Sequence, residues 1–326
     1  MKTAEQRQAW LIERQKGIGG SDAAAACGLS PWNTRYGLYL DKTMPILGDE
    51  IEREEFMWGH LLEPIIRQRF CDLHDVRILE PSGPIIHPEH DFMRCNPDGL
   101  IFKDDAKASV SNDSLDVPKM VRTKQFAATL QIKNWGHGKD QWGEPGTAEI
   151  PEQYMLQVQH EIECCQVEAA YVAILFHGNE YREYFVPRND ELIETLIEVE
   201  AEFWDCVVRR QPPEPETEGD VRKRWDKVFV HDMIEADDEL VRLWEELGAA
   251  RTQLKHWEHQ QKSLEVALKK AIADTEGIVR NGKPLCTWKE QSQQRFDTDR
   301  FKAEHPELYE QFRKQITFRK FLYRKG

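Results

Sequence analysis

The chain has 326 residues, of which 40% are hydrophobic and 31% are charged, a composition typical of a soluble globular protein. It lacks any apolar run near the roughly 18 residues that a transmembrane helix needs, and its polar N-terminal segment is unlike a signal peptide, so we expect a cytoplasmic protein without a membrane span. The formal net charge of −14 excludes a uniformly basic nucleic-acid-binding protein, although basic groups can still line a local groove.

The N-terminal part of the chain has a helical pattern. Residues 5–42 predict a helix, a glycine-rich turn and further helix. In the turn, residues 17–22, either Ser21 or Asp22 can cap the alanine-rich segment that follows. A second helix is expected over residues 54–73, where apolar side chains gather near one face.

The middle of the chain combines strands and helices. Strand-like segments are residues 78–79, 85–86, 92–95, 99–102, 126–133, 169–176 and 180–186. Helical segments are residues 151–165 and 190–209. The polar stretch 104–125 is long for a hairpin connection, so we expect a mobile loop there. This order of elements predicts a mixed α/β or α+β core.

The C-terminal third differs in composition. Residues 211–219 are rich in proline and glutamate and predict a linker. Apolar residues then recur at 3/4 spacing from Leu240 to Ala271, which is typical of a coiled coil of about four heptads. A short hairpin at 282–288 and a basic, aromatic C-terminal helix are expected to follow. We therefore predict a domain over 1–210, a linker over 211–219, and a helical or coiled-coil appendage with a basic tail over 220–326.

Two short segments carry candidate catalytic groups. Asp98 lies in a tight Pro-Asp-Gly bend before one strand, and Gln131, Ile132 and Lys133 lie on a later strand. Strand alternation places Gln131 and Lys133 on the same face, and the carbonyl of Ile132 is expected to face the same site. Oxygen ligands of this kind suit a hard divalent cation such as Mg²⁺, and Lys133 could orient or deprotonate an attacking water. Taken alone the pattern is weak, because Pro-Asp-Gly is a common turn.

Six motifs in a fixed order strengthen this interpretation. They are residues 18–24 (IGGSDAA), 29–32 (LSPW), 58–64 (WGHLLEP), 96–99 (NPDG), 131–134 (QIKN) and 157–160 (QVQH). Together they resemble the YqaJ viral recombinase family, phage exonucleases similar to lambda exonuclease, over about residues 7–210. The resemblance implies a PD-(D/E)XK restriction-endonuclease-like core, with a mixed central sheet flanked by helices and a C-terminal helical appendage.

The resemblance also implies roles for individual residues. Asp98 matches the main metal-bridging aspartate, Ile132 the backbone ligand, and Lys133 the catalytic lysine. Glu63 matches a helix glutamate that supports the metals, and Gln157 a helix glutamine that positions the site. Without the motif order, Glu63 would be read as a solvated surface residue and Gln157 as a hydrogen-bonding glutamine of the core.

A second group of residues matches a pocket for the 5′ phosphate of DNA. Arg14 and Ser21 match this pocket, and Asn96 stands where family members carry a serine of it. An arginine beside a hydroxyl at a helix N-terminus suits a phosphate on physical grounds too. Trp32 is a candidate for stacking on a base, with core packing as the alternative. His160 is expected beside the site or facing DNA.

Gln131 departs from the family pattern, which commonly has glutamate at this position. An amide oxygen can bind Mg²⁺, but it brings no negative charge. Three explanations of Gln131 stay open: the protein is a natural variant that is active, a natural variant that has lost activity, or an engineered protein that binds DNA without cutting it. Metal affinity is expected to be lower than with glutamate in each case.

The function expected from these observations is a 5′-to-3′ exonuclease on linear double-stranded DNA, encoded by a phage or prophage and acting in a bacterial cell. It would use two Mg²⁺ ions, for which Mn²⁺ could substitute, and would leave 3′ single-stranded tails. The resemblance implies a homotrimeric ring and a single-strand annealing recombinase as partner. The alternatives are a catalytically silent DNA-end-binding or scaffold protein, an endonuclease or RecB-like nuclease of the same fold, and a function dominated by interactions of residues 220–326.

Overall fold

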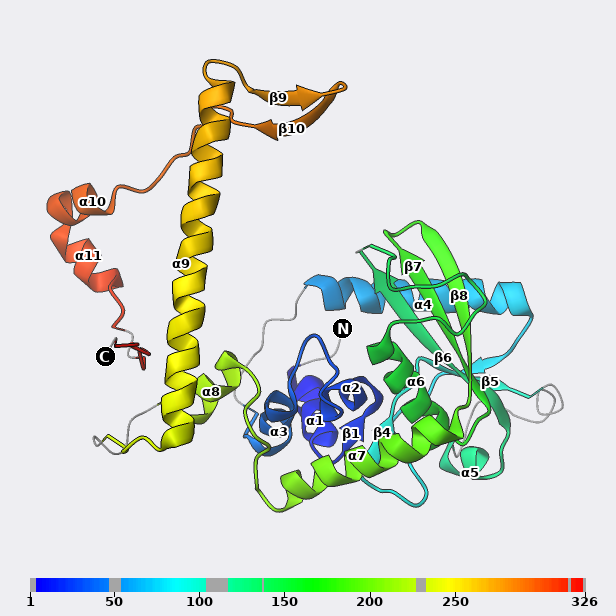
Figure 1. Ribbon diagram of the computed structural model, residues 1–326. Coiled ribbons are helices and arrows are strands. Elements are labelled where there is room, and N and C mark those ends of the chain that lie inside the picture. Colours follow the sequence, from blue (N-terminus) through cyan, green and yellow to red (C-terminus); the bar gives the residue numbers. More distant parts are fainter. Residues whose placement is uncertain are drawn as a thin grey trace. The chain divides into compact units, whose positions relative to one another are not determined.

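In a computed structural model the chain forms two compact units, residues 1–224 and residues 225–326 (Figure 1). The structure describes residues 4–46, 54–103, 117–136, 138–226, 233–315 and 318–324. Within these ranges, no helix combines the length and the apolar character that crossing a lipid bilayer requires.

A five-stranded mixed sheet forms the centre of the first unit. Its strand order is β2-β5-β6-β7-β8, that is, Ile78–Leu79, Gly99–Phe102, Phe126–Trp135, Ala169–Phe176 and Glu180–Pro187. Strands β6 and β7 pair in parallel, and the other neighbours pair antiparallel. Helix α6 (Glu152–Cys165) joins β6 to β7, because parallel neighbours need a crossover rather than a tight turn.

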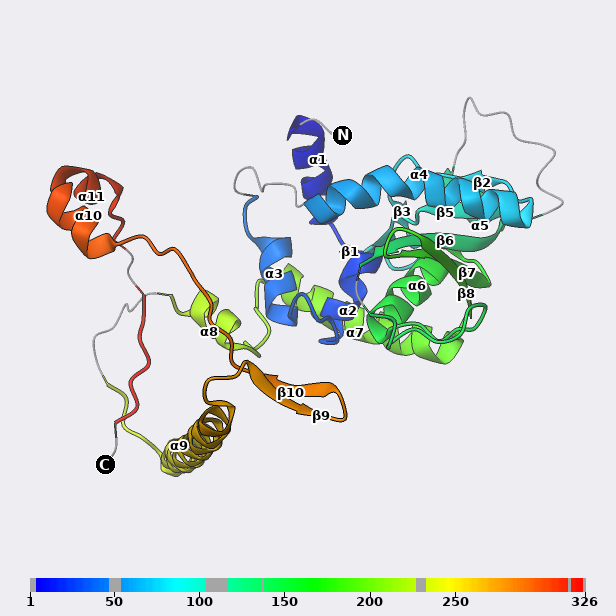
Figure 2. The same cartoon turned by 90° about the horizontal axis from the view of Figure 1, so that it is seen from above.

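Two helices cover opposite faces of this sheet. Helix α4 (Glu54–His74) lies on one face and α6 on the other (Figure 2). Because strand side chains alternate between faces, Ala173 of β7 packs in the same cluster as Phe70 of α4, while its neighbour Val172 packs with Val158 of α6. The predicted mixed sheet between helices is confirmed.

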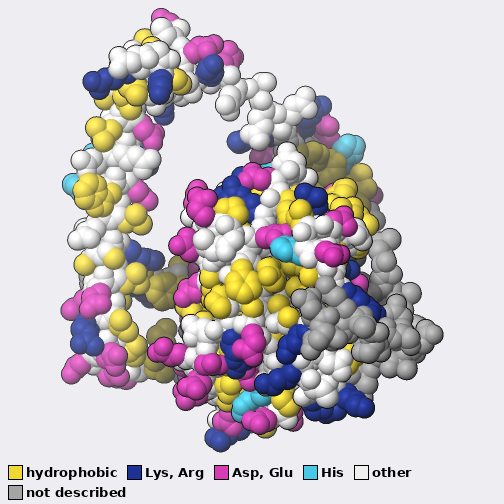
Figure 3. All heavy atoms as spheres, turned by 90° about the vertical axis from the view of Figure 1, so that its right-hand side faces the viewer, with side chains coloured by type: hydrophobic (Ala, Val, Ile, Leu, Met, Phe, Trp, Pro, Cys, Tyr) yellow, Lys and Arg dark blue, Asp and Glu magenta, His cyan; other side chains and the backbone are white. Residues whose placement is uncertain are grey.

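Smaller elements complete the first unit. A second sheet has the order β1-β4-β3, that is, Ile18–Gly19, Met93–Cys95 and Ile85–Ile86. The helices are α1 (Ala4–Arg14), α2 (Ala23–Ala26), α3 (Arg35–Thr43), α5 (Val117–Arg122), α7 (Asp190–Val208) and α8 (Glu218–Arg224), with a 3₁₀ turn over Gly20–Asp22. On the face shown in Figure 3, hydrophobic side chains gather at the centre and charged side chains of both signs surround them.

Two sequence predictions need correction in this unit. The polar stretch 104–125 is not a loop throughout, because its end forms α5, which buries Met120 and Val121. Its residues 104–116 lie outside the described part of the chain. The compact unit also continues through α8, where Asp220 is buried and accepts a hydrogen bond from Thr34 Oγ1 at 2.9 Å. The segment 211–219, for which the composition predicts a linker, therefore lies inside this unit.

The second unit contains a long helix, a hairpin and two short helices. Helix α9 (Asp238–Ile272) contains the apolar 3/4 pattern, and Asp237 caps it by accepting the N–H of Leu240. Strands β9 (Gly277–Arg280) and β10 (Lys283–Thr287) form a hairpin about a two-residue turn with positive φ at both positions. Helices α10 (Thr298–Glu304) and α11 (Pro306–Phe312) follow. The helix predicted for the basic tail is wrong for residues 318–324, which have no regular structure.

Candidate active site

The half-buried Asp98 is the centre of a polar cluster at one end of β5 and β6. Its Oδ2 accepts hydrogen bonds from the side-chain nitrogen of Gln131 and the backbone N–H of Ile132, both at 2.7 Å. Burial raises the pKa of Asp98 to about 7, although the nearby Lys133 favours the charged form. The negative charge of Glu63 raises it further. Lys133 thus balances only part of the negative charge of the Asp98 carboxylate, so the carboxylate can also bind a cation.

Strand alternation brings the other groups to the same place. Leu130 and Ile132 pack toward α4, so Gln131 and Lys133 point toward α6, where Gln157 lies. Lys133 Nζ donates to the side-chain oxygens of Gln131 at 3.2 Å and Gln157 at 3.1 Å. Gln157 Nε2 donates to the same Gln131 oxygen at 2.6 Å. The structure therefore gathers Asp98, Gln131, Lys133 and Gln157 into one hydrogen-bonded set.

Glu63 reaches the cluster from α4 through an arginine that sequence reasoning missed. Glu63 forms an ion pair with Arg67 one turn later on the same helix. The Nε of Arg67 donates to the backbone carbonyl of Asp98 at 3.1 Å, and its Nη1 donates to Glu80 at 2.7 Å. Arg67 thereby fixes the bend that carries Asp98 and balances part of the charge of Glu63. The signal in the sequence is the i, i+4 spacing of Glu63 and Arg67.

Glu161 is a second residue that sequence reasoning missed. It lies one turn after Gln157 on α6 and is 1% exposed. Its Oε1 accepts from Gln157 Nε2 at 2.9 Å, whereas its Oε2 is buried without a hydrogen-bond partner among the described residues. Burial raises the pKa of Glu161. Gly20 permits this arrangement, because a Cβ at position 20 would lie 2.7 Å from Glu161 Oε1.

The residues expected to hold a 5′ phosphate lie beside Gly20. Arg14 Nη2 donates to Ser21 Oγ at 3.1 Å and to Asp22 Oδ1 at 2.5 Å. The buried Lys42, which the sequence did not single out, donates to Asp22 Oδ2 at 2.6 Å. Although burial opposes it, Lys42 and Arg14 hold the pKa of Asp22 below its ordinary value. The structure thus joins Arg14 and Ser21 by a hydrogen bond and adds a buried ion pair between Lys42 and Asp22 beside them.

The remaining predicted DNA contacts lie at the surface. Asn96 is exposed two residues before Asp98. Trp32 is 64% exposed, so the alternative of core packing is wrong. Its ring lies 5.9 Å from the ring of Tyr154, whose face in turn lies 4.9 Å from Lys133 Nζ.

His160 lies in the protein interior and does not face the surface. It is fully buried, with Nδ1 2.8 Å from a carboxylate oxygen of Glu200 and Nε2 2.9 Å from the backbone carbonyl of Arg94. Glu200 raises the pKa of His160 to about 9, against the effect of burial. The expectation that His160 faces DNA is therefore wrong.

The donor set fits a cation that keeps waters or takes oxygens from a phosphate. Asp98 offers a carboxylate, and the Ile132 carbonyl lies on the same side of the strand as the N–H that contacts Asp98. Mg²⁺ is commonly held by one or two carboxylates together with substrate phosphates and water. No cluster of three or more acidic, histidine or cysteine side chains suited to a metal occurs among the described residues, and position 131 carries an amide. Gln131 turns its nitrogen toward Asp98, so its amide must rotate before its oxygen can share a cation.

Comparison with known sequences identifies the family. A family model described as the YqaJ-like viral recombinase domain matches residues 9–168. The uncharacterized protein YqaJ of Bacillus subtilis strain 168 is 31% identical over 326 residues, which cover 97% of this chain and 93% of the relative. The chain belongs to the YqaJ family. The matched residues include the Asp98 cluster, Glu161 and the Arg14–Ser21 pair.

Solved structures give weaker likenesses. An alkaline exonuclease from Laribacter hongkongensis has a TM-score of 0.45 and 17% identity, covering 63% of this chain and 94% of its own. A phage-related exonuclease from Haemophilus somnus 129PT has a TM-score of 0.38 and 10% identity, covering 60% of this chain and 96% of its own. The chain's family and its mixed sheet between α4 and α6 agree with the mixed sheet flanked by helices that the sequence predicts.

Proposed function

We propose that this protein is a metal-dependent 5′-to-3′ exonuclease that acts on linear double-stranded DNA and leaves 3′ single-stranded tails. The observation that carries the proposal is that Asp98 and Lys133 are joined through Gln131 in one hydrogen-bonded cluster at the ends of β5 and β6. Membership of the YqaJ-like viral recombinase family supports DNA as the substrate. The Arg14–Ser21 pair supports the 5′ end as the point of attack, because it joins a guanidinium to a hydroxyl beside the cluster.

In the proposed cleavage reaction each of these side chains has a separate role. Arg14 and Ser21 bind the terminal 5′ phosphate and set the position of the strand. Asp98, Gln131 and the Ile132 carbonyl, supported by Glu63, would hold the cations. Lys133 orients the attacking water and stabilises the negative charge that develops on the phosphate, while Gln157 keeps Lys133 in place. Two Mg²⁺ ions, or Mn²⁺ in their stead, would activate the water and stabilise the leaving oxygen.

The wider biological setting is also a proposal. Lambda-type relatives suggest a homotrimeric ring around DNA, and light scattering of the purified protein tests this assembly. A single-strand annealing recombinase is the partner expected to take up the 3′ tails. We place the protein in the cytoplasm of a bacterial host, encoded by a phage or prophage, in keeping with its viral recombinase family.

A second candidate is a DNA-end-binding protein of the same fold with weak or no catalysis. Gln131 favours it, because its amide nitrogen donates to Asp98 where a cation would otherwise neutralise the carboxylate. An endonuclease or RecB-like activity is a further alternative. The exonuclease, the DNA-end-binding protein and the endonuclease each give a different result in a cleavage assay.

The test uses linear duplexes that carry either a 5′ phosphate or a 5′ hydroxyl, with Mg²⁺, Mn²⁺ or EDTA. We expect progressive loss of the 5′-phosphorylated strand with metal and none with EDTA. Asp98→Ala and Lys133→Ala should each reduce cleavage by at least about 100-fold, the range expected for loss of a group that stabilises the transition state. Lys223→Ala, at an exposed lysine outside the cluster, is the matched control. Cutting of closed circles would favour the endonuclease, and binding without cutting would favour the scaffold.

A further inference from the structure

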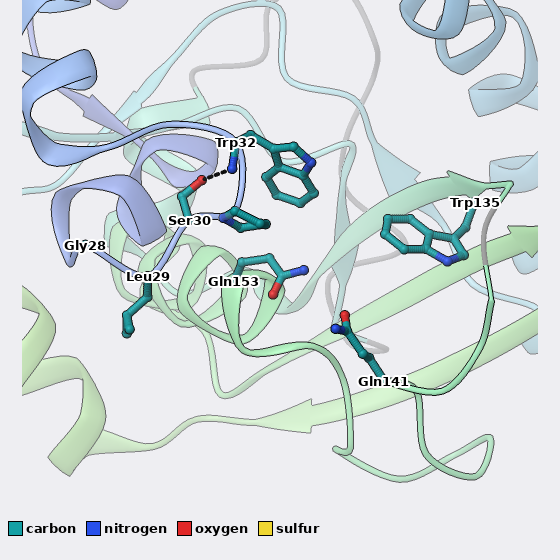
Figure 4. Close-up of a pocket in the computed structure, with 8 residues that line it drawn as sticks. Gly28, Leu29, Ser30, Trp32, Trp135, Gln141 and Gln153 are labelled. Atoms are coloured by element: carbon teal, nitrogen blue, oxygen red, sulfur yellow. Dashed lines mark hydrogen bonds between the residues drawn. The ribbon is translucent and has the colours of Figure 1, made fainter. Parts of the chain in front are cut away.

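A pocket of about 440 Å³ lies on the first unit beside the Asp98 cluster (Figure 4). One wall is the loop of residues 28–32 that follows α2, which ends in Trp32. The opposite wall is Trp135 at the end of β6, two residues after Lys133. Gln141 and Gln153 complete the lining. The pocket is therefore built from segments that also shape the proposed active site.

The two tryptophans are suited to stack on a flat ring. In Figure 4 their rings stand on either side of the space that the pocket encloses. Trp135 is fixed, because its Nε1 donates to the backbone carbonyl of Gly138 at 3.0 Å and its ring packs 6.1 Å from that of Tyr154. Trp32 is 64% exposed, so its ring is accessible to a ligand. Aromatic faces of this kind bind nucleobases without regard to sequence.

The polar groups of the pocket are neutral amides. Gln141 and Gln153 point their amides toward the space between the tryptophans (Figure 4). Neither forms a side-chain hydrogen bond with another described residue, so both are available to the edge of a ligand. Amide side chains pair well with the donor and acceptor edges of bases. The lining contains no lysine or arginine, so the pocket suits an uncharged base and not a phosphate.

Tyr154 places this pocket within reach of the reacting phosphate. Its ring lies between Trp32, at 5.9 Å, and Lys133 Nζ, at 4.9 Å. The base of a nucleotide is one sugar away from its phosphate. A phosphate beside Lys133 would therefore bring the attached or neighbouring base to the mouth of the pocket.

We propose that this pocket binds one unpaired nucleobase at the DNA end, stacked between Trp32 and Trp135 and hydrogen-bonded by Gln141 and Gln153. The proposal rests on the proposed DNA-processing function and adds a base site to it. The base comes either from the 5′-ended strand being degraded or from the 3′-ended strand left behind. Both sources have the same chemistry, so the experiment has one arm for each.

The test uses the full-length protein and duplexes that end in one unpaired 2-aminopurine nucleotide, at the 5′ end in one duplex and at the 3′ end in the other. Binding is measured in EDTA, where no cleavage is expected, by the change in 2-aminopurine emission. We expect a change in emission for the strand whose base enters the pocket. Trp32→Ala should remove this change and weaken binding about 5- to 150-fold, the fold-change that corresponds to about 1–3 kcal/mol per stacked base.

Two controls make the result specific. Trp32→Phe should retain most of the affinity, because the stacking face remains, and Trp225→Ala tests the loss of a similarly exposed tryptophan elsewhere. Gln153→Leu should weaken binding less than Trp32→Ala and leave the emission change in place. The proposal is overturned if Trp32→Ala binds both duplexes like the wild type, or if Trp225→Ala has the same effect.

The outcome is separate from that of the proposed function. An emission change that requires Trp32, in a protein that degrades no DNA with Mg²⁺, would reject the exonuclease and retain the base site. Degradation by the wild type with no emission change in either duplex would reject the base site and retain the exonuclease.

Discussion

At the scale of single residues, Asp98 combines two opposing requirements. In the proposed mechanism it binds a cation, yet it is half-buried, and this burial raises its pKa to about 7. A carboxyl group with a raised pKa in the folded state holds its proton more tightly there than in the unfolded chain. Its contribution to stability is therefore fully present below the ordinary pKa and is lost as the pH rises toward 7. Metal binding should consequently release a proton at pH 6 and little at pH 8.

Asp98→Asn tests this directly. In EDTA at pH 8 we expect the variant to have a higher Tm than the wild type, because it removes a buried charge while keeping acceptor capacity for the Ile132 N–H. A gain of about 2–4 °C would correspond to roughly 1 kcal/mol in a protein of this size. At pH 5 the difference should vanish, since the wild-type carboxyl is protonated. Calorimetry at both pH values measures it, and an equal difference at pH 5 and pH 8 would contradict the assignment.

Gln131→Glu addresses the residue that departs from the family pattern. Its amide nitrogen is 2.7 Å from Asp98 Oδ2, so a glutamate would place two carboxylates in contact. We expect lower stability in EDTA and at least tenfold tighter Mg²⁺ binding, measured by isothermal titration calorimetry, with cleavage kept or raised. Gln68→Glu, at an exposed position on α4, is the control. A clear fall in cleavage with tighter metal binding would mean that the amide has a role of its own.

At the scale of elements, helix α6 is fixed by buried polar contacts as well as by apolar packing. Glu163 is bonded to His87 and Arg188, and hydrogen bonds from His87, followed by those from Arg188, lower the pKa of Glu163 to about 2. His160 and Glu200 form a fully buried pair that joins α6 to α7. These contacts hold the helix that presents Gln157 to Lys133.

The His160–Glu200 pair predicts a pH dependence of stability. The pKa of His160 is raised to about 9, so its contribution is fully present below about 6.5 and is lost as the pH rises through 9. We expect the urea midpoint of the wild type to fall between pH 7 and pH 10. His160→Gln should cost about 3–5 kcal/mol at pH 7, because it leaves Glu200 buried without a counterion. The double variant with Glu200→Gln should recover part of this loss, and its urea midpoint should vary less with pH over this range.

The elements that carry the site could be predicted from the sequence because their patterns are local. The strand over residues 126–133 and the helix over 151–165 are confirmed. Arg14 and Ser21 form a hydrogen bond, whereas their role at a 5′ phosphate stays a prediction. Arg67, Lys42 and Glu161 were missed. The i, i+4 spacing indicates only the ion pair of Arg67 with Glu63 and not its bond to the distant Asp98. Lys42 and Glu161 likewise contact Asp22 and Gly20, which lie far from them in the sequence. Helix α5 was missed because its neighbours are polar and its two buried residues form no long apolar pattern.

At the scale of the whole molecule, α8 is part of the first compact unit and contributes to its stability. Asp220 is 2% exposed and accepts hydrogen bonds from Thr34 and Thr217, so a segment that follows a proline-rich stretch is bound to the N-terminal helices. Composition alone places the domain end at 210, whereas the compact unit runs to Arg224.

Truncation distinguishes the two limits. A fragment of residues 1–226 should unfold in one cooperative transition, and a fragment of residues 1–210 should melt lower, because it leaves Thr34 without Asp220. Loss of about 1–2 kcal/mol would lower the Tm by roughly 2–8 °C. Asp220→Ala in the full chain should reproduce much of the loss. Equal melting of the two fragments would assign α8 to the C-terminal part.

The close approach of Gly20 to Glu161 has a consequence for what the enzyme would release. Gly20 adjoins Ser21, and Glu161 is joined through Gln157 to Gln131 beside Asp98. The proposed site for the terminal phosphate and the proposed site for the bond to be cut are thus joined through Glu161. A protein with Gly20→Ala, whose added methyl group must displace the Glu161 side chain, should therefore release fragments less uniform in length than those of the wild type.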